Sequence, residues 1–263
     1  MSTPLSIRLS VVVPVFNEEV TLAKVVGKLL GLPHLHEVII VDDCSTDRTC
    51  EIARGLAEQN PSKIQVLRHE KNVGKTDALK TGFAATTGNI VIVQDADLEY
   101  DPDEIAHVVS PIARGLADVV FGSRFMVRRA ARVLYFYHYL ANQLLTFLSN
   151  LFTNLNVTDV ETGYKAFRGE IIRNMTITSR GFGFEIEVTA KIAKLKCTVY
   201  EVPISYYGRT YEEGKKIGMI DGLGALWYIV KFNLLTNLAS SYAKVPQYVT
   251  VPDGEQRLRP AAK

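Results

Sequence analysis

The sequence predicts an α/β protein whose central sheet is mostly parallel. Apolar runs rich in Val and Ile recur five times within the first 125 residues, and segments with helical spacing separate them. The runs are apolar at consecutive positions, which is typical of strands that helices cover on both faces. With 263 residues, of which 47% are hydrophobic, the chain has enough apolar material for one large domain.

Each predicted element follows from this alternation. The predicted strands cover 9–16, 37–43, 64–69, 89–95 and 117–125, and the predicted helices cover 17–32, 45–60, 75–86 and 101–115. Asn17 is a candidate N-cap of the first helix, and Ser45 or Thr46 of the second. The fourth helix has the clearest start, because Asp101 stands at the N-cap and Pro102 at the first helical position. In such sheets, ligands bind at the carboxyl ends of the strands.

The second half of the chain begins with a basic and then apolar segment. Arg124, Arg128, Arg129 and Arg132 precede or open a helical apolar pattern within residues 128–155. Polar side chains within the pattern argue against a membrane span. A basic entry to an aromatic amphipathic helix suits contact with a membrane surface. The alternative to membrane contact is that this helix packs on its own domain or in a homodimer interface.

A second apolar segment, residues 222–235, is shorter than the roughly 20 residues that a membrane span needs. We therefore expect helices near 133–155 and 217–240 that are interfacial or packed. The expected organisation is one domain over 1–235, with a nucleotide-binding half at about 9–125 and an acceptor- or membrane-facing half at about 126–235, followed by a flexible polar tail over 236–263.

Charge and cysteine content narrow the function classes. Three cysteines without CxxC spacing indicate neither a disulfide framework nor a zinc site. The first half is acidic and could hold a cation, whereas the basic second half could face phosphates or an anionic membrane. No signal-peptide pattern opens the sequence, so the cytoplasm is the expected compartment. No nucleic-acid partner is expected.

Acidic residues gather at the predicted strand ends. Glu18 follows the first strand, and Asp42 and Asp43 end the second. Caps and turns explain one such residue but not two in a row. A carboxylate there could instead accept hydrogen bonds from a ribose hydroxyl or a base N–H, so both interpretations stay open.

The fourth strand ends in Asp95, Asp97 and Glu99, and a helix start with Asp101 and Glu104 follows. Capping explains the last two acids. Two carboxylates about 4 Å apart repel by roughly 4 kcal/mol at an effective dielectric near 20, so either one is protonated or a cation lies between them. All-oxygen ligands favour Mg²⁺ or Mn²⁺, which would also hold a diphosphate. A phosphatase would use the first Asp as its nucleophile, but the residues after the second Asp fit that class less well. A Rossmann dehydrogenase would need GxGxxG after the first strand, where the sequence has "PVFNEE" instead.

Two groups of basic residues are candidates for binding an anion. Arg124 follows the fifth strand on the ligand side of the sheet, and a later segment places Arg209, Lys215 and Lys216 around Gly214, as a mobile basic loop would. For each of them, a solvated surface charge is the alternative.

Seven motifs, taken in order, resemble the family 2 glycosyltransferases of the GT-A fold, and among these the dolichyl-phosphate mannose and glucose synthases. The motifs are "VVVPVFNEE", "VIIVDDCSTDRT", "NVGKTDAL", "QDADLEYDPDEI", "FGSRF", "TGYKAFR" and "YYGRTYEEGKKI". The resemblance implies a Rossmann-like nucleotide-sugar transferase with interfacial C-terminal helices. It implies metal-dependent, inverting transfer of a hexose, from a donor of the GDP-mannose or UDP-glucose type, to a polyprenyl phosphate at the cytoplasmic membrane face.

The same resemblance implies roles for residues at the first two strand ends. Pro14, Phe16 and Glu18 match positions that contact the nucleotide base and ribose, and Val41 and Asp43 match further base contacts. Phe16 stands where a Tyr is common, which should keep the stacking and lose only a hydroxyl.

The resemblance also implies the reacting part of the site. The matching positions of the metal and diphosphate site are Asp95, Ala96, Asp97 and Glu99. Glu99 departs from the Gln that is usual there. Arg124 matches an arginine near the donor sugar and acceptor, so Asp97 and Arg124 are the expected catalytic residues.

Arg209 and Lys215 match an Arg-x5-Lys pair on a loop over the phosphates, although "EEGKK" departs from the usual "GxSK". Lys75 is a further donor-site candidate. A phosphate acceptor is already anionic, whereas a hydroxyl acceptor needs a general base, for which Glu185 is best placed. Transfer to a soluble hydroxyl acceptor is therefore the alternative function. A non-enzymatic binding module is a third hypothesis, against which the intact "DADLE" and "RTYEEGKK" argue.

Overall fold

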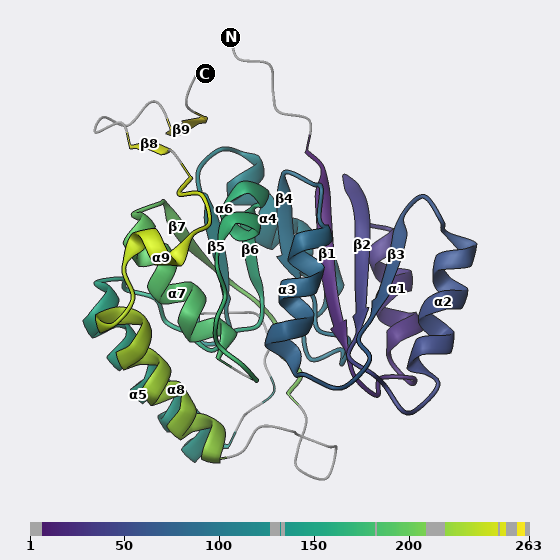
Figure 1. Ribbon diagram of the computed structural model, residues 1–263, viewed down its shortest axis with the longest axis horizontal. Helices are drawn as coiled ribbons and strands as arrows, with labels where there is room; N and C mark the ends of the chain where they lie inside the picture. Colours follow the sequence, from purple (N-terminus) through teal and green to yellow (C-terminus); the bar gives the residue numbers. More distant parts are fainter. Residues whose placement is uncertain are drawn as a thin grey trace.

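A seven-stranded sheet forms the centre of the protein (Figure 1). The computed structural model describes residues 7–126, 132, 135–181, 183–208, 219–246, 248–250 and 257–260. The strands are β1 (Leu9–Val15), β2 (Leu35–Asp42), β3 (Ile64–Arg68), β4 (Ile90–Val93), β5 (Val119–Ser123), β6 (Lys165–Arg168) and β7 (Val199–Pro203), in the spatial order β3-β2-β1-β4-β6-β5-β7. Only β6 runs antiparallel to its neighbours in this sheet. The predicted α/β class and mostly parallel sheet are confirmed.

Helices cover both faces of this sheet (Figure 1). They are α1 (Leu22–Leu30), α2 (Thr49–Gln59), α3 (Lys75–Ala85), a 3-10 turn η1 (Pro102–Glu104), α4 (Ile105–Ala113), α5 (Phe136–Thr153), α6 (Gly169–Asn174), α7 (Phe184–Leu195), α8 (Met219–Leu234) and α9 (Leu238–Ser241). A separate pair of short strands, β8 (Tyr248–Thr250) and β9 (Arg257–Pro260), lies near the end of the chain.

The two faces have separate cores because side chains alternate along each strand. In β1, Val11 and Val13 belong to the core cluster that includes α1 and α4, whereas Val12 belongs to the cluster that includes α3 and α7. All three side chains are completely buried. The consecutive Val and Ile residues of the sequence therefore reflect burial on both faces.

The first two helices begin later than the sequence predicts. Asn17 is not an N-cap: its backbone lies in the left-handed region at φ 56°, and α1 begins at Leu22. Its side-chain oxygen accepts from the backbone N–H of Thr46 at 2.9 Å, and its own N–H donates to Ser45 Oγ at 3.0 Å. These residues therefore fasten the loops after β1 and β2 to each other. The predicted cap Asp101 is confirmed, since it accepts from the N–H two residues on.

The second half adds a pair of helices beside the sheet. Helices α5 and α8 pack against each other and against α7 (Figure 1). None of the helices in the described part of the chain is long and apolar enough to cross a membrane. The expected flexible tail is wrong for its first residues, because α9 follows α8 and Tyr242, only 3% exposed, joins the core and bridges to Met175.

Candidate active site

The acid-rich turn after β4 is held in place by one buried amide. Gln94 donates from its side chain to the carbonyl oxygens of Asp95 at 2.9 Å and Tyr100 at 3.2 Å. Its side-chain oxygen accepts from the Tyr164 hydroxyl at 2.6 Å. Leu98 turns the chain in the left-handed region at φ 62°. The acids are therefore presented from a fixed turn at the carboxyl edge of the sheet.

Asp95 lies against a half-buried lysine. The Lys75 ammonium, on the first residue of α3, lies 2.8 and 2.9 Å from the two carboxylate oxygens of Asp95 and 3.7 Å from Glu185 Oε1. Burial would lower the pKa of Lys75, but the charges of Asp95 and Glu185 outweigh it and raise that pKa well above its usual value. Lys75 therefore relieves part of the carboxylate repulsion that the sequence predicts.

Asp97 and Glu99 point to other partners. Asp97 Oδ1 accepts from the backbone N–H of Glu99 at 3.1 Å, and Glu99 Oε2 accepts from the Tyr206 hydroxyl at 2.6 Å. Within the described ranges, no group of three or more acidic, His or Cys side chains is arranged to hold a metal ion. The predicted three-carboxylate arrangement of Asp95, Asp97 and Glu99 is thus not assembled in the protein alone.

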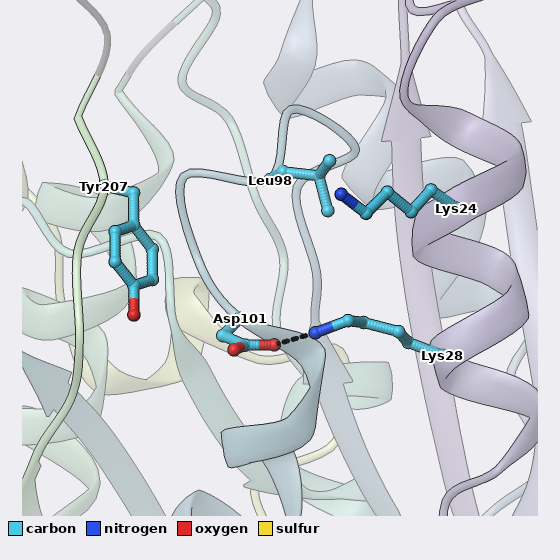
Figure 2. Close-up of a pocket in the computed structure, with 5 residues that line it drawn as sticks. All are labelled: Lys24, Lys28, Leu98, Asp101 and Tyr207. Carbon is cyan, nitrogen blue, oxygen red and sulfur yellow. Dashed lines mark hydrogen bonds and ion pairs between the residues drawn. The ribbon is translucent and has the colours of Figure 1, made fainter.

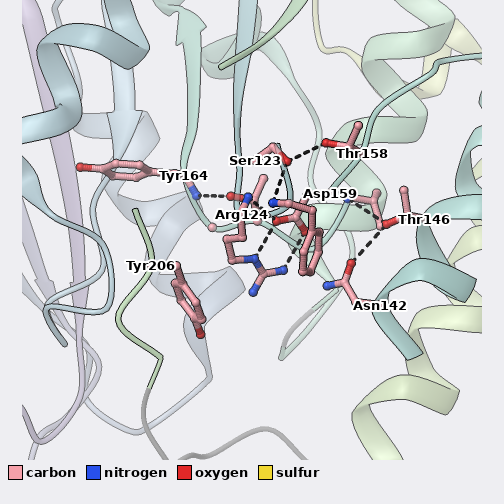
Figure 3. A network of polar contacts seen from close by, with 12 residues as sticks. Ser123, Arg124, Asn142, Thr146, Thr158, Asp159, Tyr164 and Tyr206 are labelled. Atoms are coloured by element: carbon pink, nitrogen blue, oxygen red, sulfur yellow. Dashed lines mark hydrogen bonds and ion pairs between the residues drawn. The ribbon is translucent and has the colours of Figure 1, made fainter. Parts of the chain in front are cut away.

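Arg124 is anchored at the end of β5 (Figure 3). Its Nε and Nη2 donate to the two oxygens of Asp159 at 2.6 and 2.7 Å, and the guanidinium lies 5.1 Å from the ring centre of Tyr206 and 5.5 Å from that of Phe125. Burial would lower the pKa of Arg124, but Asp159 outweighs it and raises that pKa well above the usual range. The side chain is 12% exposed, so one charged edge borders the site.

Buried ionisable groups lie next to this pair. Burial, together with the charge of Glu185, raises the pKa of Glu161 to about 7, and Glu161 Oε1 lacks a hydrogen-bond partner in the described structure. Burial lowers the pKa of Lys165 to about 8, although nearby acids oppose it. The Lys165 ammonium donates to the carbonyl oxygens of Val160 and Thr162. These groups were not anticipated from the sequence as part of a site.

The residues predicted to contact the nucleotide lie at the neighbouring strand ends. Pro14 of β1 is the register partner of Val41 of β2, so these two positions are adjacent. Phe16 and Glu18 follow in the half-buried loop after β1, where Glu18 Oε2 accepts from Thr21 Oγ1 at 3.0 Å. Ala96, the remaining predicted contact, is buried beneath the acid-rich turn.

Asp43 has a role in the protein that the sequence did not indicate. Its carboxylate accepts from the backbone N–H groups of Val73 at 3.0 Å and Gly74 at 2.7 Å, and it lies 2.7 Å from His69 Nδ1. Asp43 thereby fixes the loop that leads into Lys75. His69 was missed, because a single histidine at a strand end carries no distinguishing pattern.

A small pocket of about 160 Å³ opens beside the acid-rich turn (Figure 2). Its lining residues are Lys24, Lys28, Leu98, Asp101 and Tyr207. It is smaller than the roughly 300 Å³ of ordinary ligand pockets, so it does not enclose a nucleotide. The predicted cations Arg209 and Lys215 lie outside the described residues, and their roles stay predictions.

A solved enzyme structure has the same architecture. Glucosyl-3-phosphoglycerate synthase from Mycobacterium tuberculosis, in complex with UDP and Mg²⁺, matches with a TM-score of 0.66 at 22% identity, over 86% of this chain and 79% of that one. The same enzyme has also been crystallised with Mn²⁺ and UDP-glucose. The protein accordingly has the GT-A fold of glycosyltransferases.

The family follows from the sequence match. Residues 10–176 fit the model of glycosyl transferase family 2, and the chain belongs to this family. The predicted family resemblance is thereby confirmed, and the chain is a glycosyltransferase.

Three relatives have names that state their acceptors. The undecaprenyl-phosphate mannosyltransferase of Micrococcus luteus is 30% identical over 225 residues, covering 82% of this chain and 90% of the relative. The polyprenol monophosphomannose synthase of Mycolicibacterium smegmatis is 28% identical, covering 80% and 82%. The dolichol-phosphate mannosyltransferase of Pyrococcus furiosus is 29% identical, covering 80% of this chain, which spans only 60% of that relative's length.

Proposed function

We propose that the protein transfers a hexose from a nucleotide sugar of the GDP-mannose or UDP-glucose type to a polyprenyl phosphate, at the inner face of the cell membrane. The names of the three relatives support the acceptor class. The observation that carries the membrane part is an exposed apolar face on α5, which a soluble acceptor would not require.

This face combines aromatic and aliphatic side chains. Its most exposed members on and beside α5 are Tyr135, Phe136, Tyr137, Leu140, Leu144, Phe147 and Leu151, and α8 adds Trp227 and Leu234. Tyr139 of α5 contacts Phe125 with ring centres 5.3 Å apart, so the face begins next to Arg124. A helix with aromatic and leucine side chains on one face suits the headgroup boundary of a bilayer. A homodimer interface is the competing use of the same face.

A divalent ion, Mg²⁺ or Mn²⁺, fits the acid-rich turn in this proposal. Asp95 and Asp97 supply oxygen ligands, which such ions prefer. Gly163 leaves the space beside them open, because a Cβ there would lie 2.8 Å from Asp95 Oδ2. In this proposal Asp95 and Asp97 are the ligands, and Glu99 Oε2 accepts from the Tyr206 hydroxyl. When bound, the ion would neutralise charge on the departing nucleoside diphosphate.

The side chains of the protein orient the reactants around this centre. The base and ribose would contact Pro14, Phe16, Glu18, Val41 and Asp43, with Ala96 beneath the diphosphate. Arg124 would contact the donor sugar and the acceptor phosphate, and the predicted role of Arg209 and Lys215 is to add positive charge around the leaving group. The acceptor phosphate attacks the anomeric carbon in line and inverts it. It brings no proton to remove, so no general base is required.

The test is a panel of UDP- and GDP-sugars with Mn²⁺, offered either undecaprenyl phosphate in vesicles or water-soluble hydroxyl acceptors. Radiolabel that moves into the organic phase supports the proposal, and label only in water-soluble product overturns it. Glu185→Gln should barely change transfer to the phosphate, because Glu185 contacts Lys75 and removes no proton. Asp97→Ala should abolish transfer, whereas full activity of this variant in EDTA would contradict the metal assignment.

A further inference from the structure

We propose that Glu99 and Tyr206 are positioning residues that hold the guanidinium of Arg124 in its working orientation. The inference rests on the proposed function, in which Arg124 contacts the donor sugar and the acceptor phosphate. It gives Glu99 a task other than metal binding.

Two hydrogen bonds join Glu99 to the segment after β7. The Tyr206 hydroxyl donates to Glu99 Oε2 at 2.6 Å, and the backbone N–H of Tyr207 donates to the Glu99 carbonyl oxygen at 2.9 Å. An O–H···O⁻ bond of this length is charge-assisted and stronger than a neutral one. Burial, with the nearby Tyr100 and Glu99, raises the pKa of Tyr206, so its phenol keeps the proton that it donates.

The 3-10 turn η1, which follows the acid-rich turn, fixes the same segment at a third point. Ser205 donates to the two carboxylate oxygens of Glu104 from its N–H and its hydroxyl, both at 2.8 Å. The N–H of Ile204 donates to the Ser123 carbonyl oxygen at 3.1 Å, which ties the segment to the end of β5. Residues 204–207 are therefore each bonded to the acid-rich turn, to η1 or to the end of β5, which Arg124 follows.

Tyr206 and Asp159 restrain Arg124 in different directions. Asp159 forms two bonds in the plane of the guanidinium, through Nε and Nη2. The centre of the Tyr206 ring lies 5.1 Å from the guanidinium carbon (Figure 3). The ring centres of Tyr100 and Tyr206 are 5.3 Å apart. The bidentate ion pair fixes the orientation of the guanidinium within its own plane, and the aromatic ring limits the tilt of that plane. Glu99 acts one step further away, by setting the position of the Tyr206 ring.

The test compares Glu99→Ala, Tyr206→Phe and the double variant. Each single variant should lower kcat about tenfold, since a misplaced reacting group commonly costs one or two powers of ten. The double variant should be no worse than either single one, because both break the same bond. Glu99→Gln keeps an acceptor oxygen and should stay close to the parent protein. The affinity for Mn²⁺ in the presence of UDP, measured by electron paramagnetic resonance, should not change in any of them.

The matched controls are Asp103→Asn, an acid of the same turn that is 66% exposed, and Tyr200→Phe, a tyrosine exposed on β7. Both should leave kcat unchanged. The inference is overturned if Glu99→Ala weakens Mn²⁺ binding tenfold while Tyr206→Phe does not, which is the behaviour of a metal ligand. It is equally overturned if the losses of the two single variants multiply in the double variant.

A measurement without substrates separates this inference from the proposed function. The Arg124 Nε–H signal in a proton–nitrogen NMR spectrum, assigned with Arg124→Lys, should exchange slowly with water in the parent protein. Exchange should accelerate in both Glu99→Ala and Tyr206→Phe. If no acceptor is ever glycosylated but exchange accelerates, the proposed function fails and the positioning role stands. If exchange is unchanged in both variants, the positioning role fails whatever the acceptor.

Discussion

Helix α1 directs its apolar side chains toward the core, whereas helix α5 directs most of its apolar side chains toward solvent. Helix α1 buries Leu22, Val25, Val26 and Leu29 against the sheet and turns Lys24 outward. Helix α5 is twice as long, yet its buried residues are Thr146 and Ser149. Leu145 and Leu148 are partly buried against the core, and its other aromatic and leucine side chains are exposed. Ordinary surface helices follow the pattern of α1.

The difference shows that α5 is attached to its domain by hydrogen bonds as well as by the apolar contacts of Leu145 and Leu148. Thr146 Oγ1 accepts from the N–H of Val160 at 3.2 Å, and Asn150 exchanges two bonds with the backbone of Val157. The exposed face of α5 therefore contributes little to folding in water. This is the behaviour expected of a surface that is buried against a membrane or a second protein chain. Four predictions test the comparison of α1 with α5.

The largest effect is expected on the apolar face of α5. Replacing Phe147 and Leu151, which are 63% and 66% exposed, by glutamate should weaken binding to anionic vesicles about a hundredfold, because two apolar contacts with the bilayer are lost and two charges are repelled. The free energy of unfolding should change by less than about 0.5 kcal/mol. Vesicle sedimentation and urea titration measure the two quantities.

Lys24→Glu on α1 is the control for that double variant, because it changes the net charge by the same amount on a helix without the apolar face. Its vesicle binding should fall much less. If the double variant instead keeps its vesicle affinity and converts a dimer to a monomer in sedimentation, the face is a homodimer interface.

A core position of α1 should show the opposite behaviour. Leu29→Ala removes a completely buried side chain and should lower the free energy of unfolding by about 2–4 kcal/mol. Vesicle binding of the folded protein should not change. A loss below about 1 kcal/mol would mean that α1 is no better anchored than α5.

The buried polar side of α5 should give an intermediate effect. Thr146→Val leaves the buried N–H of Val160 without its acceptor, which should cost about 1–2 kcal/mol of unfolding free energy. Thr146→Ser keeps the hydroxyl and should restore most of that loss. Equal stability of the valine and serine variants would show that the bond contributes nothing.

The smallest effect is expected at Lys28, which pairs with Asp101 and Asp103 at 2.7 Å on the outer side of α1. Lys28→Ala should cost about 0.2–1 kcal/mol, and less in high salt. Burial would raise the pKa of Asp101, but the bond from Lys28 outweighs it and lowers that pKa below its usual value near 4. The contribution should therefore be complete above pH 4 to 5 and disappear as the pH falls through the lowered pKa. Thermal unfolding at pH 7 and pH 2.5 checks this sign.

The sequence was sufficient for the strands that are buried on both faces, because their Val and Ile runs have no other common explanation. It was not sufficient for β6, where Lys165 is completely buried within a four-residue strand. That charge interrupts the apolar pattern, and the ammonium is satisfied by carbonyl oxygens that only the folded loop supplies. The antiparallel insertion of β6 between β4 and β5 likewise depends on contacts between distant segments.

The site was predictable to the extent that strand ends are predictable. Asp95 and Arg124 lie where the strand order puts them, but their partners could not be inferred. Asp159 lies in the loop between α5 and β6, and Tyr206 is 107 residues from Glu99. Local patterns identify groups that need a counter-charge, whereas the identity of the counter-charge is a property of the tertiary structure.

The hydrogen bonds of α5 connect the surface of the protein to its reaction centre. Asn150 and Thr146 bind the backbone at Val157 and Val160, on either side of Asp159. Asp159 in turn forms the bidentate pair with Arg124. A shift of α5 would therefore move both flanks of Asp159, the residue that orients the Arg124 guanidinium. In the proposed membrane-bound state, the lipid composition around α5 would in this way affect the turnover of the enzyme without any lipid entering the donor site.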